Sequence, residues 1–240
     1  MKKIRFYLHH RIILYALIVL ITIFSACKKT LNTEGTSYSA GLMAFNLIPG
    51  NFSVGFAISG NILTLSSLFY TNYTGSYLPV YPGNGNIVCY DTHSDSVFAN
   101  DTANFVIHKY YSVFALGNNG HYSNLFVNDN LDTLSSSAGN AYVRYINAIP
   151  DSSKPMITIV SNGNTVISAN TSYASIFNFT GITPGDITIA IKNDSTFSLN
   201  RTITLEKNKA YTILLSGIPA ATDSTKAVQI GYITNGTLNP

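Results

Sequence analysis

The chain has 240 residues, of which 14 are Lys or Arg, 11 are Asp or Glu, and 46% are apolar. Four of the basic residues and none of the acidic ones lie in residues 1–26, so the remainder carries 10 basic residues and a formal net charge of −1. This balance argues against nucleic-acid binding, because beyond residue 40 no basic cluster is denser than the pair Lys207 and Lys209. The periodic segments are rich in Ile, Val, Thr, Tyr and Phe, which predicts an all-β fold.

Residues 1–26 are predicted to be a signal peptide. A basic segment over residues 1–11 precedes an apolar run over residues 12–24, and Ser25-Ala26-Cys27 closes the run. The run is shorter than the roughly 18–20 residues that a membrane-spanning helix needs. The sequence FSAC at 24–27 resembles a bacterial lipobox, which implies that Cys27 is acylated and becomes the mature N-terminus.

Acylation at Cys27 would attach the protein to a bacterial membrane, and the outer membrane is the expected one. Lys28 and Lys29 follow the cysteine, where surface-exported lipoproteins often carry acidic residues, so the periplasmic face is favoured over the cell surface. Residues 27–40 are predicted to form a tether. Cys89 then has no disulfide partner and is predicted to be a small buried apolar residue in a strand.

Beyond the tether the chain repeats itself after about 100 residues. The sequence FNLIP at 45–49 returns as INAIP at 146–150, and KYYSVFALG at 109–117 returns as KAYTILLSG at 209–217. The repetition predicts two tandem domains, at 41–130 and 141–240, joined by a polar linker at 131–140.

Short strands separated by turn signals predict a β-sandwich in each repeat. Asn162-Gly163 is a tight hairpin signal, and Tyr111 and Tyr211 each begin a late strand just after a turn. That placement predicts a tyrosine corner, in which the phenol hydroxyl bonds to the backbone of the turn. In the second repeat the predicted strands cover residues 141–147, 156–161, 165–168, 173–179, 186–193, 201–206, 211–217 and 227–234.

Three segments of the second repeat, VRYINAIPD at 143–151, Pro184-Gly185 before a strand and KAYTI at 209–213, resemble the DUF4397 family. The resemblance implies two tandem immunoglobulin-like β-sandwich domains of unknown function, of a kind found in bacterial lipoproteins, and supplies no catalytic residue. The first repeat departs from the pattern, with Ala44 in the place of Arg144 and Gly50 in the place of Asp151.

Residues that could support catalysis or metal binding are few. The sequence contains no nucleophile elbow and no zinc-protease motif. Asp91, His93 and Asp95 alternate along the chain and could place three metal ligands on one strand face. A solvated hairpin tip is the favoured interpretation of this segment. Residues 128–132 resemble a calcium loop that lacks its Gly and its Glu. No metal or cofactor is predicted, and a hydrolase using His93 or His108 is a further alternative.

Two sets of residues are candidates for recognition or modification. One segment of the first repeat is rich in tyrosines, namely Tyr70, Tyr73, Tyr77 and Tyr81. These side chains could stack on sugar rings or anchor a protein, and packing in the core is the alternative. Five Asp-Ser or Asp-Thr pairs, all expected in turns or linkers, resemble the O-glycosylation motif of exported Bacteroidota proteins. Ordinary turns are the alternative. The candidate acceptor residues are Ser96, Thr102, Thr133, Ser195 and Ser224.

Together these features predict a lipid-anchored, non-catalytic binding or spacer module of the cell envelope. Its partners would be the membrane, through the lipid, and a glycan or an envelope protein. A purely structural envelope protein is the alternative.

Overall fold

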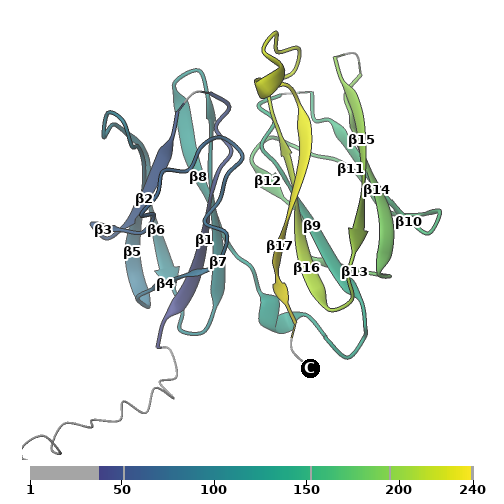
Figure 1. The fold of residues 1–240 in the computed structure, drawn as a ribbon, viewed down its shortest axis with the longest axis horizontal. Helices are drawn as coiled ribbons and strands as arrows, with labels where there is room; N and C mark the ends of the chain where they lie inside the picture. Colours follow the sequence, from purple (N-terminus) through teal and green to yellow (C-terminus); the bar gives the residue numbers. More distant parts are fainter. Residues whose placement is uncertain (1–37, 51, 152, 195, 239–240) are drawn as a thin grey trace, which may run out of the picture. The chain divides into compact units, whose positions relative to one another are not determined.

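Both repeats are β-sandwiches in the computed structural model, which describes residues 38–240 apart from residues 51, 152, 195, 239 and 240 (Figure 1). The predicted signal peptide, Cys27 and most of the predicted tether therefore lie outside the described residues. Within those residues, no helix is long and apolar enough to cross a membrane. The all-β prediction is confirmed.

The first repeat consists of two four-stranded sheets. One has the order β4-β1-β7-β8, and the other has the order β3-β2-β5-β6. In chain order, the strands are β1 (Ala40–Asn46), β2 (Val54–Ile58), β3 (Asn61–Ile62), β4 (Leu78–Val80), β5 (Gly83–Asp91), β6 (Val97–Phe105), β7 (Tyr110–Asn118) and β8 (His121–Asn128).

The second repeat has the same design. One sheet has the order β12-β9-β16-β17, with β13 also paired to β9, and the other has the order β11-β10-β14-β15. The strands are β9 (Ala141–Asn147), β10 (Met156–Ser161), β11 (Asn164–Asn170), β12 (Ser175–Ile176), β13 (Thr180–Ile182), β14 (Gly185–Lys192), β15 (Ser198–Leu205), β16 (Lys209–Ser216) and β17 (Gln229–Thr237).

Most predicted strands of the second repeat are confirmed, and one is not continuous. The segment 173–179 was expected to be a single strand, but only β12 within it is a strand, and β13 follows after a break. Phe177 lies in the break and stacks on Tyr145, with ring centroids 5.2 Å apart. Asn162 and Gly163 both have positive φ, as the predicted hairpin turn requires.

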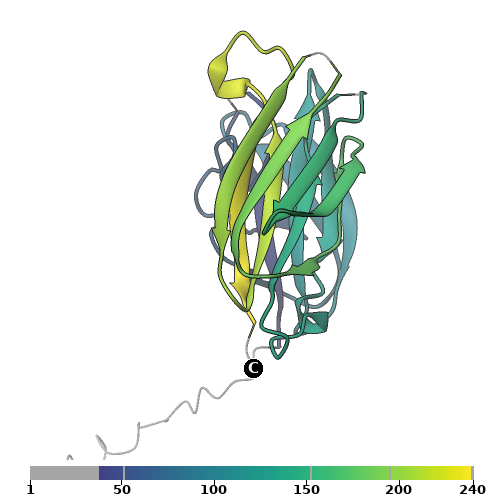
Figure 2. The ribbon, with the colours of Figure 1, turned by 90° about the vertical axis from the view of Figure 1, so that its right-hand side faces the viewer.

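The four sheets are stacked so that two are outer layers and two are inner layers. Strands β1, β7, β9 and β16 are buried along almost their whole length, whereas β5 and β14 alternate between buried and exposed residues. Burial on both faces means that the inner sheets cover each other. Figure 2, viewed from the side of the second repeat, shows its outer sheet in front of the other strands.

The strand registers correct one predicted equivalence between residues of the two repeats. Met43 pairs with Ser112 in β7, and Arg144 pairs with Thr212 in β16, so Met43 is the structural counterpart of Arg144. Ala44 instead corresponds to Tyr145, and both of these residues point into the core of their own sandwich. The assignment of Ala44 was therefore wrong by one residue, which in a strand moves a side chain to the opposite face.

The predicted linker at 131–140 packs against the second repeat. It contains a short 3-10 helix, η1 (Leu131–Thr133), and Leu131 and Leu134 contact a cluster that includes Tyr142. The Tyr142 hydroxyl also donates a 2.8 Å hydrogen bond to the carbonyl of Ser135. A second 3-10 helix, η2 (Ser224–Lys226), lies between β16 and β17.

Both tyrosine corners are confirmed. The hydroxyl oxygen of Tyr211 accepts a 2.9 Å hydrogen bond from the backbone N–H of Glu206, and that of Tyr111 accepts one of the same length from Val106. Each bond fixes the turn before a central strand of the inner sheet, and each ring is buried in the core of its sandwich.

We expect Tyr211→Phe and Tyr111→Phe each to lower the free energy of unfolding by roughly 1 kcal/mol, because a backbone N–H loses its only side-chain acceptor. Urea unfolding measures this loss. Tyr38→Phe is the matched control, since Tyr38 is 75% exposed. A loss no larger than that of the control would show that the hydroxyl does not stabilise the turn.

Candidate functional site

The inner sheets of the two repeats meet along an apolar surface. Side chains from β1 and β7 contact side chains from β9, β16 and β17, and the cluster has members from both repeats. Its fully or nearly fully buried members are Met43, Phe45, Leu47, Phe114, Leu116, Ile146, Ala148, Leu214 and Ile233. Burial of this surface holds the two sandwiches together.

A buried ion pair lies at one end of this apolar surface. Arg144 Nη1 is 2.7 Å from Asp129 Oδ1, and the two side chains are 3% and 0% exposed. Asp129 belongs to the first repeat and Arg144 to the second, so the pair joins the two repeats. A buried charge that lost its partner would remain desolvated and uncompensated, which is strongly unfavourable.

Four neutral side chains complete a hydrogen-bonded network around the ion pair, which we call the polar ring. On the first-repeat side, Asp129 Oδ2 accepts hydrogen bonds from the Tyr77 hydroxyl at 2.5 Å and from the Ser112 hydroxyl at 2.8 Å. Burial, together with the charge of Asp129, raises the pKa of Tyr77, so this phenol remains protonated and donates.

On the second-repeat side, Arg144 Nε donates to the Thr212 hydroxyl at 2.8 Å, and Thr212 donates to Asn235 Oδ1 at 2.5 Å. The Asn235 amide then donates to the Tyr77 hydroxyl at 3.2 Å, which closes the ring across the two repeats. The polar ring therefore consists of Tyr77, Ser112, Asp129, Arg144, Thr212 and Asn235.

Two pairs of polar-ring side chains occupy equivalent positions of the two repeats, whereas the counterpart of Arg144 is the apolar Met43. Ser112 corresponds to Thr212, according to the strand registers. Asp129 and Asn235 each follow the residue that pairs with the corner tyrosine of their repeat. The two repeats thus face each other with the same surface, as subunits do in a two-fold symmetric dimer.

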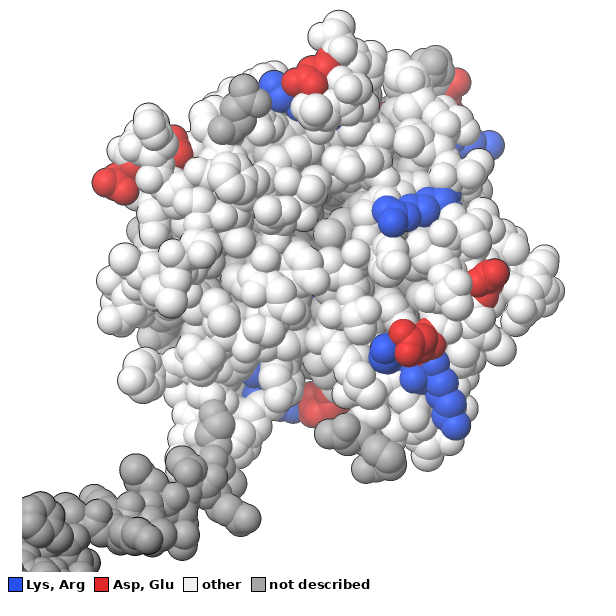
Figure 3. All heavy atoms as spheres, in the orientation of Figure 1, with Lys and Arg blue, Asp and Glu red and all other residues white. Residues whose placement is uncertain are grey.

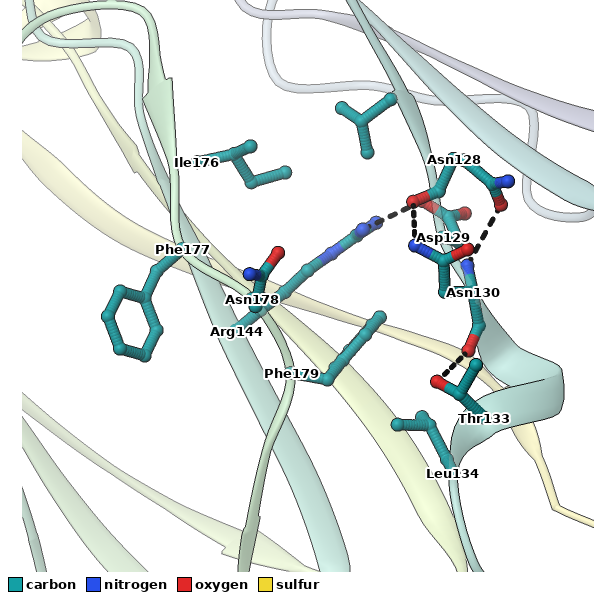
Figure 4. Close-up of a pocket in the computed structure, with 11 residues that line it drawn as sticks. Asn128, Asp129, Asn130, Thr133, Leu134, Arg144, Ile176, Phe177, Asn178 and Phe179 are labelled. Carbon is teal, nitrogen blue, oxygen red and sulfur yellow. Dashed lines mark hydrogen bonds and ion pairs between the residues drawn. The ribbon is translucent and has the colours of Figure 1, made fainter.

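A cleft of about 510 Å³ opens beside the polar ring (Figure 4). Arg144 extends across it toward Asp129, and its guanidinium lies 4.5 Å from the centre of the Phe179 ring. Asn128, Asn130 and Asn178 also line the cleft. Its two charged side chains neutralise each other, and their donors and acceptors are engaged within the protein.

The structure places the four candidate tyrosines in different surroundings. Tyr73 and Tyr77 pack against the apolar cluster between the repeats. Tyr70 is also largely buried, which raises its pKa, and the neighbouring side chains of Ser216 and Gln229 in the second repeat partly offset this effect. Tyr81 is 89% exposed. The structural alternative therefore fits the first three, and Tyr81 is the one displayed to solvent.

The residues considered for catalysis do not converge. His93 and His108 lie at opposite ends of β6, which at ~3.3 Å per residue separates them by roughly 30 Å. Asp91 accepts hydrogen bonds from the backbone N–H of His93 and from the Ser94 hydroxyl, as in an ordinary hairpin turn. The described residues contain no group of His, Cys, Asp or Glu side chains suited to a metal ion.

Cys89 and Asp129 of the segment compared with a calcium loop are both buried inside the protein. Cys89 is fully buried in the core of the first repeat, and burial raises the pKa of its thiol to about 12. The prediction of a small buried residue is thus confirmed. Asp129, within the segment compared with a calcium loop, instead pairs with Arg144.

Three of the five candidate glycosylation residues lie in turns or the linker. Ser96 and Ser224 are exposed, Ser96 after the β5–β6 turn and Ser224 at the start of η2. Thr133 ends η1, and its hydroxyl donates to the carbonyl of Asn130. Thr102 lies within β6, so the expectation of a turn was wrong there, although its side chain is on the exposed face. Ser195 lies outside the described residues.

The first repeat carries very little charge. Residues 41–130 contain five charged side chains, and residues 141–240 contain twelve. The space-filling view shows few charged atoms over the first repeat (Figure 3). Between β2 and β5 this repeat also exposes large apolar side chains, among them Ile62, Leu65 and Phe69.

The family comparison agrees with the fold. The model for DUF4397, a domain of unknown function, matches residues 40–154 and 141–232. The chain belongs to the DUF4397 family. The predicted resemblance is therefore confirmed, and it extends to the first repeat. None of the curated proteins compared with this DUF4397 chain matches it.

The solved structures that match the chain include three described as candidate cell adhesion proteins. Those from Bacteroides eggerthii and Bacteroides ovatus are each 8% identical to this DUF4397 chain, cover 84% of it, and are themselves covered to 97% and 99%, with TM-scores of 0.26 and 0.25. The protein from Parabacteroides distasonis is 7% identical, covers 84% of the chain, and is covered to 98%, with a TM-score of 0.20. TM-scores this low do not establish a shared arrangement of strands.

We expect Asp129→Asn to lower the free energy of unfolding by roughly 3–5 kcal/mol, because it leaves Arg144 buried without a counter-charge. Arg144→Met, which installs the residue type of the equivalent position in the first repeat, should also destabilise, since it leaves Asp129 as the unpaired charge. The double variant should lose less than the sum of the two, which urea unfolding in a double-mutant cycle measures.

Glu206→Gln is the control for this cycle, because the Glu206–Lys209 pair is solvent-exposed and should contribute much less. If the Asp129 and Arg144 losses simply added, the two side chains would not be energetically coupled.

Proposed function

We propose that this protein is a lipid-anchored, non-catalytic module of the bacterial cell envelope, whose first repeat contacts a glycan or an envelope protein. The sequence features at 1–27 support the anchoring, and the separation of His93 from His108 supports a non-catalytic role. In this proposal the outer membrane carries the anchor, and the folded repeats lie on its periplasmic side.

The observation that carries the binding role is the surface of the first repeat. It combines a scarcity of charge with exposed Ile62, Leu65, Phe69 and Tyr81. Exposed aromatic and aliphatic side chains on a neutral surface are typical of contact regions rather than of surfaces that only need to stay in solution. The second repeat, joined to the first through the polar ring, then supports and orients it.

A spacer without a ligand is the second candidate. The ion pair and the apolar cluster between the repeats favour it, because they couple the two sandwiches into one body that could set a distance from the membrane.

The binding role predicts that the double substitution Leu65→Lys and Phe69→Lys reduces binding at least tenfold, since two charges would have to lose water on contact. The measurement is retention of the purified chain from Lys28 onward on immobilised polysaccharide and protein fractions of the native envelope, tested separately. Both side chains are exposed, at 96% and 61%, so folding should be preserved.

Val166→Lys, at a 37% exposed position of the second repeat, is the control for added charge. Absence of retention on either fraction, or retention that the double substitution leaves unchanged, would contradict the binding role and favour the spacer.

The proposed modifications predict the mass of the protein purified from its native host. Acyl chains at Cys27 and glycans at one or more of the candidate sites (Ser96, Thr102, Thr133, Ser195 and Ser224) should raise the intact mass above that of the unmodified chain cut before Cys27. Peptide mapping then assigns each addition, and Cys27→Ser should remove the lipid and release the protein from membranes. A mass equal to that of the acylated chain without glycans would count against glycosylation, and a mass equal to that of the unmodified chain would count against the anchor as well.

A further inference from the structure

A small pocket lies on the first repeat between the β2–β3 turn and the β4–β5 turn. Its volume is about 160 Å³, below the roughly 300–1,000 Å³ of pockets for drug-sized ligands. Ile58, Val80 and Phe105 form its apolar base and belong to or pack against the core of the sandwich. Tyr81 and Ile62 line its exposed rim.

The polar groups of this pocket are neutral. Ser59, Asn61 and Asn84 line it, and no charged side chain is among its lining residues. Among the described residues, the Ser59 and Asn84 side chains have no hydrogen-bond partner, and Asn61 makes only a 3.5 Å bond to the carbonyl of Ile58. These amides and this hydroxyl are therefore available to a ligand, and each can both donate and accept.

Two tight turns hold these groups in place. Ser59 and Gly60 both have positive φ, which is the geometry of a two-residue hairpin turn, and they position Asn61. Pro82 and Gly83 follow Tyr81 directly, and the proline ring restricts the backbone there. A pocket fixed by such turns needs little ordering when it binds, so less affinity is lost to entropy.

We propose that this pocket binds one neutral pyranose ring of a glycan. The face of the Tyr81 ring packs against the C–H face of the sugar, while Asn61 and Asn84 exchange hydrogen bonds with its hydroxyls. The absence of charge among the lining residues disfavours sialylated, sulfated or phosphorylated sugars, whose charge would be desolvated without a counter-ion. This inference rests on the proposed binding function and assigns the ligand class to one site.

The site is independent of the surface that joins the two repeats. None of its lining residues belongs to the apolar cluster between the inner sheets or to the polar ring. A sugar can therefore bind without separating the repeats, and substitutions at the pocket should leave the stability of the interface unchanged.

The test uses the chain from Lys28 onward, which retains every described element, on an array of neutral gluco-, galacto- and manno-oligosaccharides with sialylated and sulfated counterparts. We expect binding to neutral members. Titration of a bound oligosaccharide should show at least a tenfold loss of affinity for Tyr81→Ala and for Asn84→Ala. Tyr38→Ala, at an exposed tyrosine outside the pocket, should bind like the unaltered chain.

Thermal unfolding of each variant controls for folding, which the 89% exposure of Tyr81 should leave intact. Equal binding by Tyr81→Ala, a preference for charged glycans, or no binding to any glycan would overturn the inference. A chain that binds no glycan but retains an envelope protein through Leu65 and Phe69 would overturn this site alone. A chain that binds neither would overturn the proposed binding function as well.

Discussion

The arrangement of the two repeats depends on one buried ion pair. Asp129 and Arg144 lie on opposite repeats and are almost completely removed from solvent, so separating the inner sheets would break the pair and disturb the hydrogen bonds of the polar ring. A buried ion pair is often no more stabilising than apolar side chains of the same size, but its loss is costly when only one partner is removed. The clearest consequence of the ion pair is therefore that it fixes how the two inner sheets align. Two apolar sheets can pack in many ways, but few of these satisfy all six polar side chains at once.

Sequence patterns predicted the local structure well and this contact poorly. The strand bounds of β9 and β10, the hairpin at Asn162 and both tyrosine corners depend on residues close together in the chain, where periodicity and turn chemistry are informative. Tyr77 and Asn235 are 158 residues apart, and nothing local to either residue shows that they meet. The sequences of β1 (AGLMAFN) and β16 (KAYTILLS) do not alternate between apolar and polar residues as a strand with one solvated face does. This pattern could have indicated that both faces of these strands are covered.

Burial also explains why a cluster of tyrosines was an ambiguous signal. A tyrosine has an apolar ring and a polar tip, so it serves equally well in a wet binding surface and in an interface that contains a hydrogen-bond partner. Tyr73 and Tyr77 pack between the repeats, and Tyr77 has its partner in Asp129. Tyr81, only four residues further along, follows β4 and faces solvent. The difference is set by the second repeat, which covers one side of this segment and leaves the other side open.

The use of the inner faces for contact between the repeats limits where a ligand can bind. Both inner sheets are covered, so the remaining surfaces are the outer sheets, the strand edges and the turns at the ends of each sandwich. On the second repeat these surfaces carry most of the charge of the folded chain, whereas on the first they are nearly neutral. The Tyr81 pocket lies on the neutral repeat, between the β2–β3 turn of the outer sheet and the β4–β5 turn, which connects the inner sheet to the outer one. Because no residue that lines this pocket belongs to the polar ring, a ligand bound there would leave the Asp129–Arg144 contact intact.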